Sequence, residues 1–189
     1  MGPGKPKLHH QKPWSHGGRT DLADIEKAEL TFLVGVLGET PGGRERVASS
    51  TAKSLERGVL DGNLDAILER LTVSVDSGDF ADRGLVVEAV PEDWDLKVAS
   101  LRGVEEHLAA DAVLASNTSS LSVTGLAGEL GRPENFLGLH FFNPVPASTL
   151  IEVVIGKQTR PELVDAARAW TQALGKTAVV VNDAPGFAS

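Results

Sequence analysis

From residue 44 onward, apolar positions follow two alternating patterns, one typical of helices and the other of buried strands. Segments 44–58 and 161–175 repeat apolar residues every three or four positions and end in a glycine. Segments 84–90 and 112–116 are apolar almost throughout, as expected of strands covered on both faces. The complete expectation is strands at 71–75, 84–90, 112–116, 135–142, 150–156 and 177–181, and helices at 44–58, 63–71, 91–108, 122–130 and 161–175. This alternation predicts an α/β domain with a largely parallel sheet flanked by helices.

Residues 1–20 lack both patterns. They carry four basic residues, no acid and three prolines, which predicts a disordered basic arm. Three of the five histidines lie here, at positions 9, 10 and 16, but no acid or cysteine accompanies them. A solvated tail is therefore favoured over a metal site, and no metal is expected in this protein.

Composition narrows the class of protein. The chain has 189 residues, of which 41% are hydrophobic, enough for one folded domain with a core. Its net charge of −8 argues against a nucleic-acid partner. The absence of cysteine excludes disulfides and thiolate chemistry and is consistent with a cytoplasmic protein. We also expect no membrane span and no signal peptide, because no apolar run has the required length.

Polar side chains follow three successive strands of the expected sheet. Glu88 and Glu92 follow the strand at 84–90, residues 117–120 follow the next, and His140 and Asn143 follow the third. Ligands of open α/β sheets bind beyond the carboxyl ends of the strands. The three clusters therefore predict one polar site at this edge.

Five segments in this order are similar to the NAD-binding domain of L-3-hydroxyacyl-CoA dehydrogenases. They are VVEAVPEDWDLK (86–97), LASNTSSLS (114–122), RPENFLGLHFFNPVP (132–146), LIEVVIG (150–156) and LGKTAVVVNDAPGF (174–187). The resemblance covers about residues 44–189 and implies a Rossmann-like fold with NAD as cofactor. It further implies interconversion of (S)-3-hydroxyacyl-CoA and 3-oxoacyl-CoA in fatty acid metabolism, as in beta-oxidation, with acyl-CoA as the substrate.

His140 and Glu152 match the catalytic pair of that family. Histidine titrates near neutral pH and can exchange a proton with an alcohol in both directions. Glu152 lies in an apolar strand, where a carboxylate needs a partner to offset its desolvation, and His140 is the natural one. On the residues alone, His140 would more often be a core histidine bonded to the backbone.

The resemblance assigns further roles, each of which has a plainer structural alternative. Ser119 and Asn143 match residues beside the nicotinamide and the reacting group; otherwise Ser119 caps a helix and Asn143 shapes a turn. Glu92 and Lys97 match cofactor contacts, and Lys97 also lies near the acyl-CoA in the family. Asn117 is assigned to the cofactor as well, although a turn role is at least as natural. The expected coenzyme A contacts are Ser50 and Arg57, whose alternative is an exposed helical face.

The chain departs from the family at its start. The family opens with a strand, a G-x-G-x-x-G turn and a helix that hold the pyrophosphate. Here Gly35, Gly38 and Gly42 follow a different spacing. Residues 31–37 form one expected strand, which can stand for the first or the second family strand but not for both. If it is the second, Glu39 is a candidate for the ribose contact. We therefore expect 21–43 to be an atypical segment replacing the first βαβ unit.

At the other end, the family continues with a helical domain, which we expect to be absent from this chain. The chain is thus expected to be incomplete at both ends, and its expected protein partners are a second copy in a homo-oligomer or the missing helical domain, which in the family forms a wall of the active-site cleft. Three functions follow: an NAD-dependent dehydrogenase, an inactive or weak relative, and a binding or interaction module.

Overall fold

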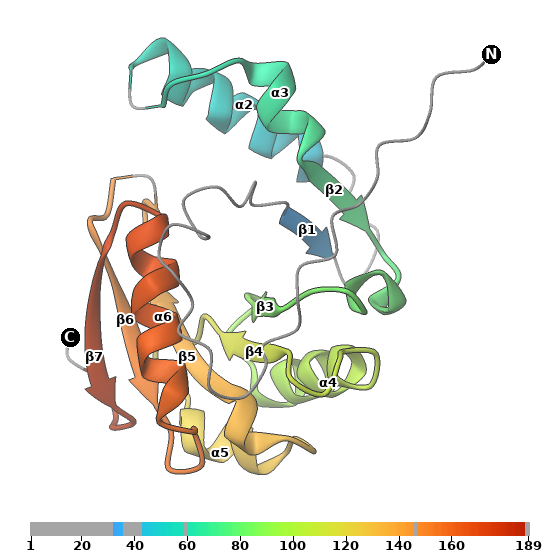
Figure 1. Ribbon diagram of the computed structural model, residues 1–189, viewed down its shortest axis with the longest axis vertical. Helices are drawn as coiled ribbons and strands as arrows, with labels where there is room; N and C mark the ends of the chain where they lie inside the picture. The colour runs from blue at the N-terminus through green and yellow to red at the C-terminus, as the bar shows by residue number, and fades with distance from the viewer. Residues whose placement is uncertain (1–31, 36–42, 59, 146, 188–189) are drawn as a thin grey trace.

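The computed structural model describes residues 32–35, 43–58, 60–145 and 147–187 (Figure 1). The N-terminal arm, Glu39 and most of the expected atypical segment lie outside these ranges. The strands are β1 (Phe32–Gly35), β2 (Leu71–Ser74), β3 (Leu85–Glu88), β4 (Val113–Ser116), β5 (Phe136–Phe141), β6 (Leu150–Ile155) and β7 (Thr177–Asn182). The α-helices are α2 (Gly43–Glu56), α3 (Leu64–Glu69), α4 (Trp94–Glu105), α5 (Val123–Gly128) and α6 (Glu162–Ala173), and two 3-10 helices are η1 (Ser77–Phe80) and η2 (Pro133–Asn135).

The main sheet has five strands in the order β3-β4-β5-β6-β7. All neighbours are parallel except β5 and β6, which are antiparallel. The reason lies in their connection. A parallel crossover needs a dozen or more residues, and only residues 142–149 separate the two strands. The expected Rossmann-like α/β fold with a largely parallel sheet is confirmed.

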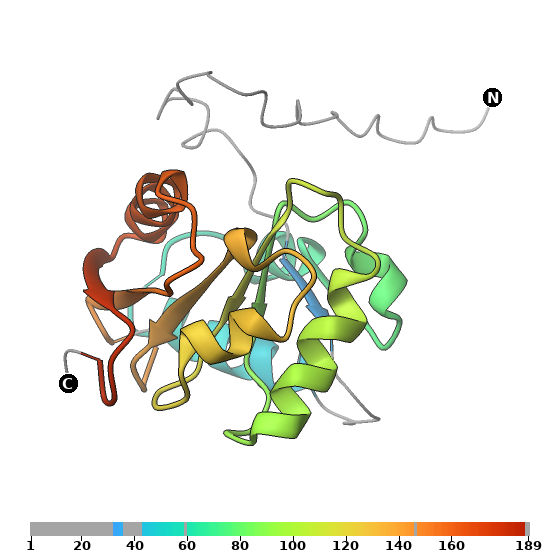
Figure 2. The ribbon, with the colours of Figure 1, turned by 90° about the horizontal axis from the view of Figure 1, so that it is seen from below.

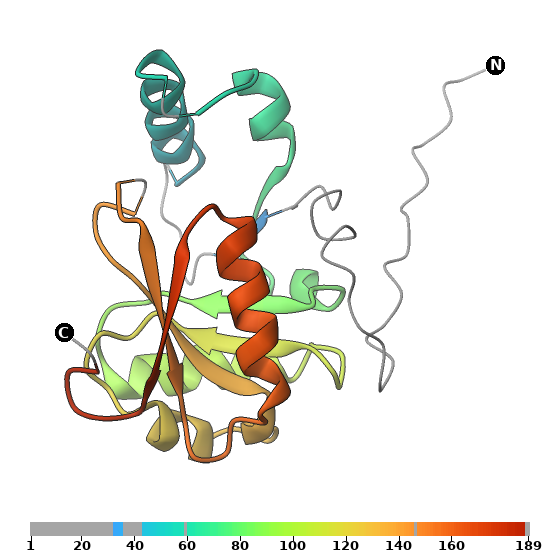
Figure 3. The ribbon, with the colours of Figure 1, turned by 60° about the vertical axis from the view of Figure 1, so that its left-hand side comes forward.

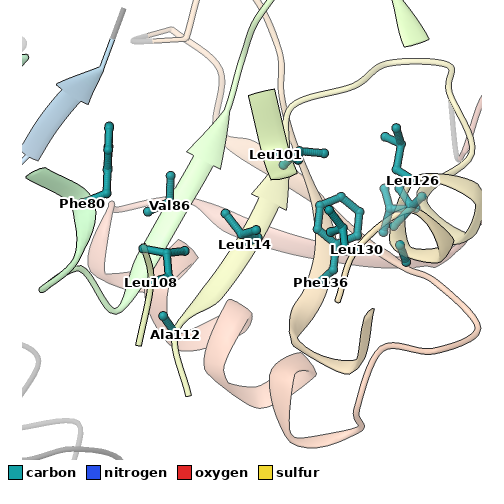
Figure 4. Packing of buried hydrophobic residues seen from close by; sticks show 12 residues of the cluster. Phe80, Val86, Leu101, Leu108, Ala112, Leu114, Leu126, Leu130 and Phe136 are labelled. Carbon is teal, nitrogen blue, oxygen red and sulfur yellow. The ribbon is translucent and has the colours of Figure 1, made fainter. Parts of the chain in front are cut away.

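Helices cover both faces of this sheet, and each face has its own core (Figure 2). On one face, α4 and α5 pack against the strands through Leu101, Leu126 and Phe136, part of the cluster drawn in Figure 4. On the other face, α6 packs through Leu163 and Ala167 (Figure 3). The almost wholly apolar strands are explained by this burial from both sides.

Side chains fix where several helices begin. Asn63 accepts the amide hydrogens of Asp65 and Ala66 at the start of α3, and Asp93 accepts that of Leu96 at the start of α4. Helix α5 is capped by Ser122, which accepts the amide hydrogen of Gly125. The alternative that Ser119 caps this helix is therefore wrong, because α5 begins at Val123.

Strands β1 and β2 form a separate parallel pair, with Phe32 opposite Leu71. In the doubly wound order 3-2-1-4, the third strand pairs with the second, and the first lies between the second and the fourth. Here β1 pairs with β2, and helices α2 and α3 lie between them in the sequence. Strand β1 therefore corresponds to the second strand of the doubly wound order, and β2 corresponds to the third. Within the described residues, no strand is paired between β1 and β3.

None of the helices in the described ranges combines the length and the apolar character that a membrane crossing requires.

Gly138 in β5 lies close to side chains of both β6 and α5, so its substitution should destabilise the fold. A Cβ atom there would lie 2.8 Å from Val154 Cβ and 3.0 Å from Val123 Cγ2. Gly138→Ala is therefore expected to lower the free energy of unfolding by about 1–3 kcal/mol, measured by urea denaturation. As a control, Gly103→Ala in α4 meets no atom within 4 Å. This control should stabilise the protein by about 0.5–1 kcal/mol. Equal effects of the two substitutions would contradict the packing argument.

Candidate active site

His140 and Glu152 face each other directly across the antiparallel pair of β5 and β6. His140 Nδ1 lies 2.7 Å from Glu152 Oε2. The two side chains are 12% and 3% exposed, so the pair is almost withdrawn from water. The short connection between these strands sets the register, and the register brings the imidazole and the carboxylate together.

The hydrogen bond to Glu152 determines which ring nitrogen of His140 can accept a proton. A carboxylate only accepts, so Nδ1 carries the hydrogen and Nε2 keeps its lone pair. Nε2 has no hydrogen-bonding partner within the part of the chain that the structure describes. The rings of Phe142 and Phe187 lie 4.4 Å and 6.1 Å from the imidazole between centroids. The site thus holds one basic nitrogen beside an apolar wall.

A second cluster joins the ends of β3 and β4 through Glu92. Its Oε1 accepts hydrogen bonds from the amides of Ser119 and Ser120, both at 3.0 Å, and from the Thr118 and Ser120 hydroxyls at 2.5 Å and 3.0 Å. Burial alone would raise the pKa of Glu92, but these hydrogen bonds outweigh it and lower the pKa from 4.5 to about 2. The turn that carries Ser119 is therefore held by a charged glutamate, and the side chain of Ser119 remains exposed.

Because the folded-state pKa of Glu92 lies below its ordinary value, its ionised form stabilises the fold. This stabilisation is fully present above about pH 4.5 and is lost as the pH falls towards 2. Glu92→Gln should therefore destabilise the protein at neutral pH, and its difference from the unmodified protein should shrink between pH 4.5 and 2. Urea midpoints across this range test the prediction, with the exposed Glu106→Gln as control. A pH-independent difference would contradict it.

Lys97 and Glu88 form a buried ion pair behind this cluster. The Lys97 ammonium lies 2.9 Å and 3.2 Å from the two Glu88 oxygens, and the side chains are 1% and 3% exposed. Glu88 also accepts a hydrogen bond from Ser116 Oγ at 2.6 Å. Glu88 was expected at this edge of the sheet, but without a functional role. The sequence did contain an indication of such a role, because Glu88 is the one charged residue in the otherwise apolar segment 84–90.

Asn117 connects the second and third strand ends. Its side-chain oxygen accepts the amide hydrogen of Phe141 at 2.8 Å, which fixes the end of β5 beside that of β4. Together with Glu92, this bond brings the three predicted strand ends to one edge of the sheet. Asn143 follows β5 as an exposed residue with no side-chain bond in the described ranges. Its role beside the cofactor stays a prediction.

The expected coenzyme A residues Ser50 and Arg57 are exposed on and just after α2. Figures 1 and 3 both place α2 on the side of the sheet towards which β5 runs. Within the described residues, their side chains form no hydrogen bond or ion pair with His140 or Glu92. The structure therefore does not bring them into the cluster, and their contact with substrate stays a prediction.

Asp183 has no role among the residues predicted from the sequence. Its carboxylate accepts hydrogen bonds from Ser122 Oγ and from the amides of Val123 and Thr124, at 2.8–3.1 Å. Burial would raise its pKa, but the hydrogen bonds from Thr124 and Ser122 lower it. This clamp fixes the turn after β7 against the start of α5, and the same turn carries Phe187 towards His140.

The chain is similar to a known protein family and to several solved structures. The model of the 3-hydroxyacyl-CoA dehydrogenase NAD-binding domain matches residues 37–184. The (S)-3-hydroxybutyryl-CoA dehydrogenase PaaH1 from Ralstonia eutropha is 32% identical, with a TM-score of 0.80 over 89% of this chain and 60% of that one. FadB2 from M. tuberculosis is 33% identical, with a TM-score of 0.80 over 88% and 60%. The 3-hydroxybutyryl-CoA dehydrogenase from Escherichia coli is 30% identical, with a TM-score of 0.78 over 87% and 35%. The chain thus spans 60% or less of the length of these proteins.

Proposed function

Because the chain belongs to the 3-hydroxyacyl-CoA dehydrogenase NAD-binding domain family, we propose that it interconverts (S)-3-hydroxyacyl-CoA and 3-oxoacyl-CoA. NAD is the cofactor of this family of domains. The observation that carries the proposal is the 2.7 Å contact between His140 and Glu152. Its biological setting would be fatty acid metabolism, including beta-oxidation, and a cytoplasmic location is part of the proposal.

The pair suits the proton transfer that this reaction requires. Oxidation of a secondary alcohol releases a proton from oxygen and a hydride from carbon, and NAD supplies the hydride acceptor when bound. His140 Nε2 takes the hydroxyl proton and returns it in the reverse direction. Glu152 stabilises the imidazolium that forms and holds the ring in the required tautomer.

The residues at this edge fit one end of the cofactor. Exposed Ser119 and Asn143 and the partly exposed Glu92 offer hydroxyl, amide and carboxylate groups where an α/β sheet binds its ligand. These groups, with Asn117, would face the nicotinamide and its ribose. A G-x-G-x-x-G turn, which holds the pyrophosphate in dinucleotide-binding domains, does not occur in the sequence.

The remaining assignments belong to the same proposal. Acyl-CoA is the proposed substrate, with Ser50 and Arg57 towards its coenzyme A part. Residues 44–189 would form the NAD-binding domain, with 1–20 as a basic arm and 21–43 replacing the first βαβ unit. A second copy or a helical domain would close the cleft. Neither nucleic acid nor a membrane is a proposed partner.

Two measurements on the unmodified chain test this function. NADH should bind, as seen by quenching of tryptophan fluorescence, and acetoacetyl-CoA should then cause loss of NADH absorbance. Acetoacetate without coenzyme A serves as the control and should react far more slowly. Failure to bind NADH would overturn the proposal.

The alternative is an inactive or weak relative that acts as a binding module. The specific observation in its favour is the lack of the glycine turn in the sequence. Binding of NADH without any oxidation by acetoacetyl-CoA would support this alternative over the enzyme.

A further inference from the structure

The ammonium group of Lys97 is fully committed to protein acceptors. It donates hydrogen bonds to the two Glu88 oxygens at 2.9 Å and 3.2 Å and to the Val90 carbonyl at 3.0 Å. Glu92 Oε2 lies 3.5 Å away as an ion-pair contact. The side chain is 1% exposed. A lysine in this position has no donor left for a ligand, although the family resemblance assigns it to cofactor and substrate.

Glu88 holds that ammonium more firmly than Glu92 does. Both Glu88 oxygens lie within 3.2 Å of Nζ. The same carboxylate also accepts hydrogen bonds from the Val90 amide at 2.5 Å and from Ser116 Oγ at 2.6 Å. Two anchors, one just after β3 and one at the end of β4, therefore fix Glu88, and Glu88 in turn fixes the position of the positive charge.

The two oxygens of Glu92 have different partners. Oε2 faces the Lys97 ammonium, and Oε1 accepts the amide hydrogens of Ser119 and Ser120. The position of the positive charge therefore favours the orientation of the Glu92 carboxylate in which one of its two equivalent oxygens faces inward. The other oxygen is left to hold the turn that presents Ser119.

We propose that Glu88 is a positioning residue that acts through Lys97 to orient the Glu92 carboxylate and so holds the Ser119–Ser120 turn in place. This inference deepens the proposed function, since Ser119 is one of the residues assigned to the cofactor. On this account Lys97 contributes to cofactor binding without touching the cofactor.

Amide hydrogen exchange in the cofactor-free protein tests the inference without reference to activity. The double variant Glu88→Gln/Lys97→Met removes the buried charges together. The glutamine oxygen can still accept the Val90 amide hydrogen, and its NH2 group can donate to Ser116 Oγ. Replacing both members of a buried pair preserves folding better than removing one. Exchange at Ser119 and Ser120 is expected to accelerate about tenfold or more, because a charge-assisted arrangement is lost. Amides of β6 should remain protected, which would show that the variant is folded.

A matched control exists at the opposite end of α4. The Glu105 carboxylate accepts the amide hydrogens of Gly131 and Arg132 at 2.8 Å and 2.9 Å, a clamp like that of Glu92 but remote from it. Glu105→Gln should accelerate exchange at residues 131 and 132 and leave residues 119 and 120 unchanged.

Cofactor affinity provides the second measurement. The double variant should bind NADH about tenfold more weakly than the unmodified chain, whereas Glu105→Gln should bind it equally well. Unchanged exchange at Ser119 and Ser120 in the folded double variant would overturn the inference. That result would not affect the proposed function. If the unmodified chain did not bind NADH, the proposed function would be refuted, but the exchange result would still hold.

Discussion

Replacing His140 with glutamine is expected to slow the reduction of acetoacetyl-CoA by about 10²- to 10⁴-fold, the range typical of a lost general acid–base. Glutamine keeps an amide near the position of the ring but cannot gain and lose a proton at neutral pH. Because His140 acts on the substrate oxygen in this account, the affinity for NADH should remain unchanged. Steady-state rates and NADH titrations on the same preparations measure the two quantities.

A matched control for this substitution is His107→Gln. His107 is exposed beyond the end of α4, at the opposite end of that helix from the candidate site. Its substitution should leave the rate within about twofold of the unmodified chain, as for other surface positions. An undiminished rate in His140→Gln would show that another group carries the proton.

Glu152→Gln should lower the same rate by about 10²-fold or more, because the imidazolium formed during oxidation loses its counter-charge. The affinity for NADH should again be unaffected. The thermal midpoint of unfolding should not fall, since a neutral amide at this 3% exposed position avoids the desolvation cost of a carboxylate. A loss of rate without a loss of stability separates this role from a purely structural one.

The control for this variant is Glu129→Gln. Glu129 pairs with Arg102 at 2.5 Å on the surface, where its side chain is 41% exposed. Its substitution removes a carboxylate from an ion pair without touching the site, so the rate should be unchanged. If Glu152→Gln retained the full rate, the contact with His140 would have no part in the reaction.

Much of the fold could be predicted because its strands are short and buried on both faces. The expected strands at 84–90, 112–116, 135–142 and 150–156 contain β3 to β6, with errors of at most two residues at their ends. The antiparallel pairing of β5 and β6 was not predicted. It could have been, since residues 142–149 are too few for a parallel crossover.

The candidate site was only partly readable from sequence. The polar residues after three strands were informative because parallel strands end at one edge. The Asp183 clamp was missed because its partners lie 59–61 residues away along the chain. The buried Glu88–Lys97 pair spans only nine residues, but it joins a strand to the next helix, and their packing is not visible in the sequence. Lys97 lies one turn into a helix, where a lysine is usually exposed to solvent, and only the folded structure shows its buried acceptors.

The most direct test of the central claim is a comparison of four proteins: the unmodified chain, His140→Gln, Glu152→Gln and the double variant. If the two side chains act as one proton-transferring pair, the double variant should reduce acetoacetyl-CoA at the rate of His140→Gln alone, within about twofold. Losses that multiply in the double variant would show that the imidazole and the carboxylate act independently, and would contradict the account.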